Sequence, residues 1–393
     1  MISRTGLGWG RCVVVSLAGV AAIAVAGRLS AGADSDDRNG FESTHLAVGR
    51  HLFEEETFGG NGRTCQTCHS RETGTVSPAD AQERMARDPN DPLFRGDGSD
   101  DGAGNGADRM LTHATVLVGV TLADNVSLAA DPKVRTAVVR RGIPSTINTP
   151  GLDAELMYDG RHRSLDEQAR SAILGHAAAT RPPTAKEIER IAEFERSRRF
   201  FSSSGLWNFA VTGRPPILPP GRTAAEKRGR EFFDDVPVGK GSSKRGACAV
   251  CHSGPLLNET NEFIPAPPRR RGGRFQSILV SELNAMGNPL QEFVFRKPDG
   301  TTATILSPDP GRALVTGKLD LENLNAFKIP QLWGVADTAP YFHDSSAKTL
   351  EEVMLHYKKF FEIVTDPKID GDPAIELTEQ DQQDLVAYLK LLR

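Results

Sequence analysis

Two five-residue motifs in this chain have the residue types and spacing for redox chemistry. Residues 65–69 and residues 248–252 each read Cys-x-x-Cys-His. This pattern is the attachment signature of a c-type haem, because each thiol can add to one haem vinyl group while the adjacent imidazole binds the iron. The sequence therefore predicts two covalent haems, with the attachment cysteines Cys65, Cys68, Cys248 and Cys251 and the iron ligands His69 and His252.

A dithiol redox site and a zinc site are the alternatives to haem at these motifs. A thioredoxin-like dithiol needs no histidine after the second cysteine, and a zinc site would need further cysteines. The chain has only one other, Cys12. Haem attachment is therefore the favoured interpretation.

The N-terminal segment that contains Cys12 has the pattern of a secretory signal peptide. Arg4 and Arg11 precede an apolar stretch at 13–26, and small residues end the segment at Ala33. We expect a signal peptide at residues 1–33, since the apolar run is shorter than the roughly 20 residues that cross a bilayer. Export to the periplasm agrees with haem attachment, and no membrane span is expected after cleavage.

Length and charge limit the kind of protein further. The chain has 393 residues and a formal charge of −4, which loss of the three arginines in the signal segment lowers to −7. This balance excludes a strongly basic nucleic-acid face, so no nucleic-acid partner is expected. The length suits two domains of ordinary size.

An internal duplication organises the rest of the sequence. A Gly-Arg-x-x-Phe segment precedes each motif, an Ile-Pro pair follows each haem histidine after 75 or 78 residues to the proline, and an aspartate stands six residues before a leucine in each half. A threonine three residues before an acid recurs near the end of each half. The paired landmarks are Gly49 and Gly229, Pro144 and Pro330, Asp159 and Asp344, Leu165 and Leu350, Thr184 and Thr378.

The elements that must position the motifs are mostly helices. Ser164, Thr184, Thr349 and Thr378 each precede an acidic, apolar-periodic run, as helix N-caps do. Few stretches look like strands, and the better candidates are 114–122 and 293–296. The predicted fold class is mainly α: two tandem cytochrome-c-like haem domains with short β insertions. We place them at 34–212 and 223–393, joined by a proline-rich linker at 213–222.

Two polar segments have a specific alternative. The acids of residues 97–108 have the spacing of a calcium-binding loop, although a plain polar loop is favoured. Residues 265–274 gather four arginines, which form either a docking patch for an acidic partner or, as we favour, a solvated loop.

Several motifs together resemble the bacterial dihaem cytochrome c peroxidase/MauG superfamily over most of the chain. They are the two haem motifs, residues 143–148, 157–161 and 165–169, and residues 327–330 with 338–344. The resemblance implies that the N-terminal haem is the reactive, peroxide-binding one and that the C-terminal haem is a six-coordinate electron-transfer centre. It also implies an electron donor such as a small c-type cytochrome or cupredoxin.

The sixth ligand of the second haem is expected to be Tyr357. In the peroxidases that the chain resembles, a Met stands 14 residues after the His that corresponds to His343, whereas MauG-like enzymes have Tyr there, as this chain does. Met354, one helical turn earlier, is the alternative. A phenolate should stabilise oxidised iron, whereas a thioether would raise the haem potential.

The duplication suggests that the first haem has an open coordination position. Ala172 stands seven residues after Leu165, as Tyr357 stands seven after Leu350, and alanine cannot bind iron. His176 and His113 are the candidates for a distal role, either as an acid-base group or as a removable ligand, and we favour His176.

The chain departs from the superfamily at three positions. Tyr158 replaces the usual Trp between the haems, and Ala178 replaces the Glu that assists peroxide cleavage, so His176 is the substitute acid-base group. Gln168 matches. Gly142 replaces an Asn that helps bind calcium, which leaves Thr338 and Pro340 as candidate calcium ligands.

Three functions remain open. The first is a periplasmic dihaem peroxidase that reduces hydrogen peroxide with electrons passed from the C-terminal to the N-terminal haem. A MauG-like oxidase of a protein or organic substrate is favoured by Tyr357 and Tyr158. A non-catalytic electron carrier, with His176 closing the first haem, is favoured by the missing Glu. We commit to the first.

Overall fold

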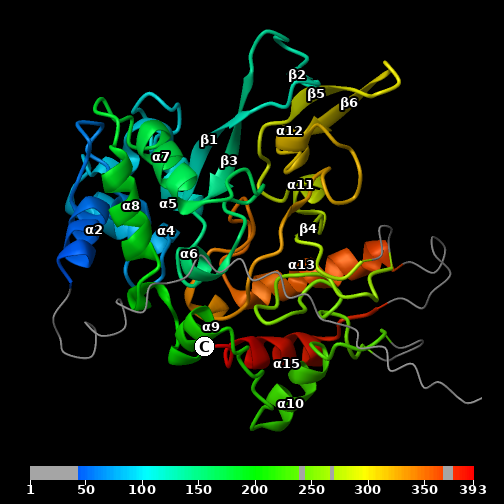
Figure 1. Cartoon of the computed structure of the whole chain (residues 1–393). Helices are drawn as coiled ribbons and strands as arrows, with labels where there is room; N and C mark the ends of the chain where they lie inside the picture. Colours follow the sequence, from blue (N-terminus) through cyan, green and yellow to red (C-terminus); the bar gives the residue numbers. More distant parts are fainter. Residues whose placement is uncertain (1–42, 239–243, 266–269, 366–374) are drawn as a thin grey trace, which may run out of the picture.

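The computed structural model describes residues 43–238, 244–265, 270–365 and 375–393; the expected signal peptide at 1–33 lies outside these ranges. The described chain is mainly helical, with short strands (Figure 1). The α-helices are α2 (Thr44–Glu54), α3 (Cys65–Cys68), α4 (Pro78–Arg87), α5 (Asp108–His113), α6 (Thr149–Leu152), α7 (Leu165–Gly175), α8 (Ala185–Glu195), α9 (Ser204–Thr212), α10 (Ala224–Glu231), α11 (Val280–Leu283), α12 (Ala313–Thr316), α13 (Leu350–Val364) and α15 (Glu379–Leu389). Short 3-10 helices are η2 (Pro92–Phe94), η3 (Gly96–Gly98), η4 (Arg198–Phe200) and η5 (Val335–Asp337). The strands are β1 (Thr115–Thr121), β2 (Val126–Leu128), β3 (Thr136–Gly142), β4 (Phe275–Gln276), β5 (Gln291–Arg296), β6 (Thr302–Ser307) and β7 (Phe327–Lys328).

The expected N-caps begin the helices that the sequence indicated. The side chains of Ser164, Thr184, Thr349 and Thr378 each accept a hydrogen bond from the backbone N–H three residues later. An acidic residue lies in the first turn of each of these helices, where it complements the positive helix end. These four helix starts are confirmed.

The two halves of the chain repeat one helix crossing. Helix α2 packs on α8, and α10 packs on α15 (Figure 1). At the first crossing a Cβ on Gly49 would lie 2.2 Å from the carbonyl oxygen of Arg190, and at the second a Cβ on Gly229 would lie 2.2 Å from that of Asp384. Each crossing therefore needs a glycine for the close approach of the two backbones, which explains why Gly49 and Gly229 are landmarks of the duplication.

Three small antiparallel sheets accompany the helices in the described ranges. They pair β1 with β3, β2 with β5 and β6, and β4 with β7. The two strands expected from the sequence are confirmed as β1 and β5. Because β2 comes from the first half of the chain and β5 from the second, the sheet they share joins the halves.

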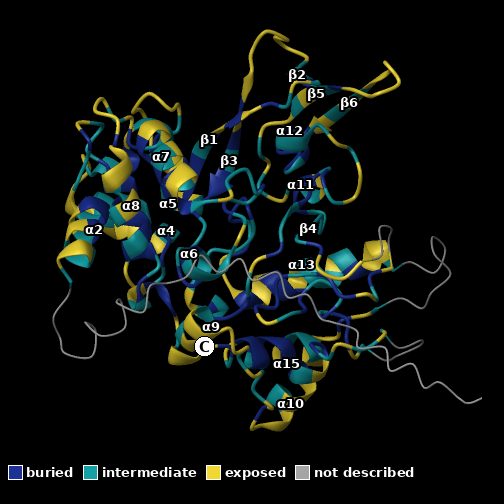
Figure 2. Ribbon diagram, in the orientation of Figure 1, coloured by how far each residue is buried: buried dark blue, intermediate teal, exposed yellow. Residues whose placement is uncertain are grey.

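Buried polar contacts also join the two halves. Arg141 of β3 is buried and donates to Asp309 at 2.7 Å and to Asp159 at 2.6 Å. Nearby, the backbone N–H of Gly142 donates to the carbonyl of His343 at 2.7 Å. Figure 2 shows the buried residues on the inner faces of the helices and strands and the exposed ones on the outer faces. The two halves are therefore connected by buried contacts.

The proline-rich segment 213–222 has neither helix nor strand and lies between α9 and α10, as expected. Its Pro219 carbonyl accepts a hydrogen bond from the Tyr388 hydroxyl at 3.1 Å. Among the helices of the described ranges, none is both long enough and apolar enough to cross a membrane.

Candidate haem sites

The first motif forms the single helical turn α3, whose Cys65 follows the N-cap Thr64. The Nδ1 atom of His69 lies 2.8 Å from the carbonyl oxygen of Gly74. A carbonyl only accepts, so Nδ1 carries the proton and Nε2 keeps its lone pair. Burial lowers the pKa of His69, which favours the neutral imidazole that binds iron.

The second motif repeats this arrangement. The Nδ1 atom of His252 donates to the carbonyl oxygen of Leu257 at 2.7 Å. His252 is buried, and burial lowers its pKa to about 4. Both histidines are thus held in the tautomer and protonation state of a haem ligand.

One cavity of about 1210 Å³ borders both motifs. Single small-molecule sites are usually about 300–1,000 Å³, so this cavity exceeds an ordinary ligand site. Its lining includes both haem histidines, the four motif cysteines and many apolar side chains. The space suits large, flat, mostly apolar groups.

The thiols at both motifs lack the character of a reactive redox dithiol. Burial raises the pKa of Cys65 and Cys68, and it raises those of Cys248 and Cys251 to about 12. Reactive redox dithiols have lowered pKa values instead. The four cysteines are free thiols, and no group of three or more His, Cys, Asp or Glu side chains in the described ranges could hold a metal ion. The residues present therefore fit a haem at each motif.

The structure places a tyrosine hydroxyl opposite the second haem histidine. The hydroxyl oxygen of Tyr357, on α13, lies 3.5 Å from Nε2 of His252. Tyr357 borders the cavity, and burial raises the pKa of its hydroxyl. Met354 also borders the cavity, but it belongs to the core cluster that includes Leu385 and Leu389. The geometry agrees with Tyr357 as the sixth ligand, which stays a prediction.

The structure brings the predicted residues of the first site to the same cavity. Tyr158, Gln168, Ala172 and His176 all border it. His176 lies close enough to His69 for the two side chains to interact electrostatically. His113 does not border the cavity and lies near Lys348 and Asp344 instead. His176 is thus the distal candidate that the geometry supports.

The contacts at the predicted calcium positions do not provide evidence for a calcium site. A Cβ on Gly142 would lie 2.4 Å from Oγ of Ser345, so a side chain there would require Ser345 to move. The Thr338 hydroxyl donates to the carbonyl of Val335 at 3.1 Å, and Pro340 borders the cavity. Ala178 is exposed and outside the cavity lining. Calcium at Thr338 and Pro340 stays a prediction.

The two polar segments are loops held by internal contacts. Asp101 accepts backbone hydrogen bonds from Ala103 at 2.8 Å and Asn105 at 3.0 Å. Residues 266–269, which include Arg269, lie outside the described ranges; Arg270 pairs with Glu322 at 2.8 Å and Arg274 pairs with Asp153 at 2.6 Å. These pairs favour the loop interpretation over a calcium site or a free basic patch.

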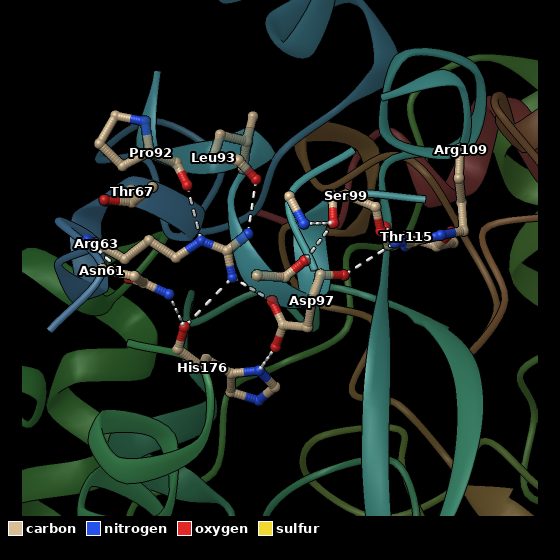
Figure 3. Close-up of polar contacts among 12 residues, drawn as sticks. Asn61, Arg63, Thr67, Pro92, Leu93, Asp97, Ser99, Arg109, Thr115 and His176 are labelled. Atoms are coloured by element: carbon tan, nitrogen blue, oxygen red, sulfur yellow. Dashed lines mark hydrogen bonds and ion pairs between the residues drawn. The ribbon is translucent and has the colours of Figure 1, made fainter. Parts of the chain in front are cut away.

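Sequence reasoning missed three polar residues near the first motif. Arg63 and Asp97 contact each other and His176 (Figure 3). Glu195 of α8 is 5% exposed, borders the cavity, and has an Oε2 atom without a hydrogen-bond partner in the described ranges. Burial raises its pKa to about 8. The duplication contained a signal for Glu195, because its counterpart in the second half is Leu389.

Residues 43–204 match the model of the di-haem cytochrome c peroxidase family. This part of the chain is therefore similar to that family. The cytochrome c551 peroxidase of Nitrosomonas europaea is 24% identical over 58% of this chain and 64% of that protein. The methylamine utilization protein MauG of Methylophilus methylotrophus is 26% identical over 64% of this chain and 68% of that protein.

A cytochrome-c peroxidase IdrP1 of a Pseudomonas species is 26% identical over 61% of the chain and 64% of that protein. The match thus covers 64% of the length of each of the two peroxidases. A solved MauG-like protein associated with microbial copper homeostasis aligns with 89% of this chain and 88% of that chain, at 21% identity and a TM-score of 0.49.

Proposed function

We propose that this chain is a periplasmic dihaem c-type cytochrome oxidoreductase that reduces hydrogen peroxide. The observation that carries the proposal is the unequal pair of sites on one cavity. The second haem histidine has the Tyr357 hydroxyl 3.5 Å away, whereas the matching helix position in the first site is Ala172. An electron-transfer centre needs both axial positions filled, and a reactive centre needs one open.

The proposal includes the domain organisation expected from the sequence. A signal peptide at 1–33 would be removed, cytochrome-c-like domains at 34–212 and 223–393 would each carry one haem, and the linker would be 213–222. The repeated crossing of α2 with α8 and of α10 with α15 supports two such domains. Electrons would come from a small soluble c-type cytochrome or cupredoxin.

A haem held by Cys65, Cys68 and His69 would supply the iron at which peroxide is reduced. The role of the chain is to move protons beside it. His176 takes a proton from the near oxygen of peroxide and returns it to the leaving oxygen, because cleavage requires a protonated leaving group. Gln168, one turn before Ala172 on α7, orients peroxide, and Tyr158 borders the cavity that both motifs share. Two electrons and two protons convert one peroxide to two waters.

The second candidate is a MauG-like oxidation of a protein or organic substrate. It is favoured by Tyr357 opposite His252 and by Tyr158, which borders the cavity and has a hydroxyl pKa raised by desolvation. A tyrosine beside a cavity that two redox centres share can pass electrons from an outside substrate to those centres. In this case peroxide serves as oxidant and the substrate supplies the electrons.

Visible and EPR spectra of the purified protein, with and without peroxide, test the proposal. We expect one low-spin site that peroxide and cyanide leave unchanged and one site that both perturb. Consumption of peroxide with a reduced c-type cytochrome or cupredoxin supports the peroxidase. Peroxide-dependent loss of an organic electron source, without use of the protein donor, supports the oxidase. If both sites are low-spin and neither reacts with peroxide or cyanide in any redox state, the protein is a non-catalytic electron carrier.

A further inference from the structure

The imidazole of His176 belongs to a chain of three side chains that comes from separate parts of the sequence. Its Nδ1 atom contacts Oδ2 of Asp97, and the other oxygen of Asp97 contacts Nη1 of Arg63 (Figure 3). His176 follows α7, Asp97 lies in η3, and Arg63 stands two residues before Cys65. The fold alone assembles this group.

Arg63 is held rigidly in the interior. Its side chain is 2% exposed, its Nε donates to the carbonyl of Pro92 at 2.9 Å, and its Nη2 donates to the carbonyl of Leu93 at 2.6 Å. A guanidinium carries donors only, so the oxygen of Asp97 that faces it must be an acceptor. Arg63 therefore decides which way the Asp97 side chain points.

Asp97 is ionised in this setting. Burial raises the pKa of its carboxyl, but hydrogen bonds and charge interactions with His176 and Arg63 outweigh burial and leave the pKa below its ordinary value. A carboxylate only accepts, so the proton of the neutral imidazole resides on Nδ1 and the lone pair on Nε2. Figure 3 shows Nε2 on the ring edge that faces away from Asp97.

We propose that Asp97 is a positioning residue that fixes His176 in the tautomer with its Nε2 lone pair available to the first haem site, and that Arg63 sets the orientation of Asp97. The inference rests on the proposed role of His176 in peroxide cleavage and deepens it. A base must have its lone pair ready before the peroxide proton can move. An aspartate that holds a catalytic histidine in one tautomer has the same effect in serine proteases.

Backbone contacts tie this group to the haem-attachment motif. Nδ2 of Asn61 donates to the carbonyl of His176 at 3.0 Å, and the N–H of Asn61 donates to the carbonyl of Ala177 at 2.9 Å. A Cβ on Gly98 would lie 2.0 Å from Nη2 of Arg63, so the η3 turn also needs its glycine for this packing. The distal imidazole and the start of the motif are thus positioned as one unit.

The substitution Asp97→Asn tests how the tautomer of His176 is set, because it removes the carboxylate while the side-chain volume at position 97 stays almost constant. Because Arg63 only donates, the introduced amide must turn its oxygen toward Arg63 and its NH₂ toward His176. Nδ1 of His176 must then accept, and its proton moves to Nε2. Asp97→Glu keeps a carboxylate and is the conservative variant.

The experiment follows cyanide binding to the oxidised protein by its absorption spectrum, together with peroxide turnover. Cyanide enters as HCN and needs a base, so we expect Asp97→Asn to slow cyanide association and turnover by about 10²-fold or more. His176→Ala should do the same, and the double variant should lose nothing further, because Asp97 acts only through His176. Asp97→Glu should recover part of the cyanide rate.

Asp91→Asn is the matched control. Asp91 forms a similar partly buried pair with Arg84, at 3.0 Å and 2.6 Å, in the same stretch of chain but without contact to His176. It should leave cyanide association unchanged. If His176 instead closes the first haem, Asp97→Asn should shift that haem toward high spin and speed cyanide entry, again with no effect in the His176→Ala background; this also supports the inference.

The inference is overturned if Asp97→Asn binds cyanide as the unmodified protein does, if it acts equally in the His176→Ala background, or if Asp97→Glu is as impaired as Asp97→Asn. Failure of the proposed function looks different. In that case the unmodified protein consumes no peroxide, while Asp97→Asn still changes cyanide binding through His176.

Discussion

The two haem-motif sites share the same helix crossing and histidine hydrogen bond, but the side chains that line the cavity differ between them. The helix crossings at Gly49 and Gly229 are alike, and each haem histidine donates Nδ1 to a backbone carbonyl five residues later. The side chains at matching cavity positions differ: Ala172, His176 and Glu195 in the first half stand against Tyr357, Phe361 and Leu389 in the second. The scaffold therefore fixes the proximal side, and a few side chains decide whether the distal side is open.

The elements around the two sites also make the second site more apolar than the first. Helix α7 ends at Gly175, whereas α13 continues to Val364 and adds Phe360 and Phe361 beside Tyr357. The second site thus lies in an aromatic, apolar environment, and its His252 is 8% exposed. The first site has an imidazole and a carboxyl group at the matching positions. Apolar packing suits electron transfer, whereas proton transfer needs polar groups.

Removal of one cysteine pair should have the largest effect on this comparison. We expect the mature protein to carry two covalent haems, so that Cys65→Ser with Cys68→Ser loses the reactive site, and Cys248→Ser with Cys251→Ser loses the electron-transfer site. Intact mass should fall by one haem in each variant. A single haem on the unmodified protein would contradict the assignment of both motifs.

The Tyr357→Phe substitution should make the second site resemble the first. It deletes the hydroxyl that lies 3.5 Å from Nε2 of His252, so the low-spin signal should disappear and cyanide should bind at both sites. Met354→Leu is the control and should leave the EPR spectrum unchanged. The reverse pattern would make Met354 the ligand.

The pseudo-equivalent aspartates Asp159 and Asp344 should differ in their effect on stability. Asp159 pairs with Arg141 inside the protein, whereas no ion pair of Asp344 occurs in the described ranges. Asp159→Asn should cost about 3–5 kcal/mol because it weakens a buried charge network. Asp344→Asn should cost about 1 kcal/mol. Urea unfolding monitored by circular dichroism measures both, and equal losses would show that Arg141 does not depend on Asp159.

A smaller, pH-dependent difference should come from Glu195. Its pKa is raised from 4.5 to about 8 by burial, so the folded state holds a proton that the unfolded state releases between these values. Stability should therefore fall as pH rises through this window, by up to about 1.4 kcal/mol per pH unit. Glu195→Gln should remove the dependence, as should Glu195→Leu, which copies Leu389. Melting temperatures of the unmodified protein and of both variants at pH 5 and pH 8 measure this dependence. If the variants show the same difference between the two pH values as the unmodified protein, Glu195 is not its source.

Much of the fold and of the proximal chemistry could be predicted from the sequence because those signals are local. Four N-caps, two strands and the repeated Gly landmarks depend on residues within one turn or on a constant spacing. The distal residues were harder to predict from the sequence. Of two candidate histidines, the sequence could not decide that His113 lies outside the cavity, since the distance of a side chain from the motif depends on how the helices pack.

The sequence by itself thus determined the two attachment motifs, the duplication, and the Ala172 for Tyr357 difference, because covalent spacing and internal comparison need no tertiary information. Only the tertiary structure joined both motifs to one cavity, through β2 with β5 and Arg141 with Asp309. It also decided that Asp97, 79 residues from His176 and 34 from Arg63, contacts both. The reason is physical: the buried guanidinium of Arg63 needs an anion beside it, and only the folded chain determines which of its many acids lies there.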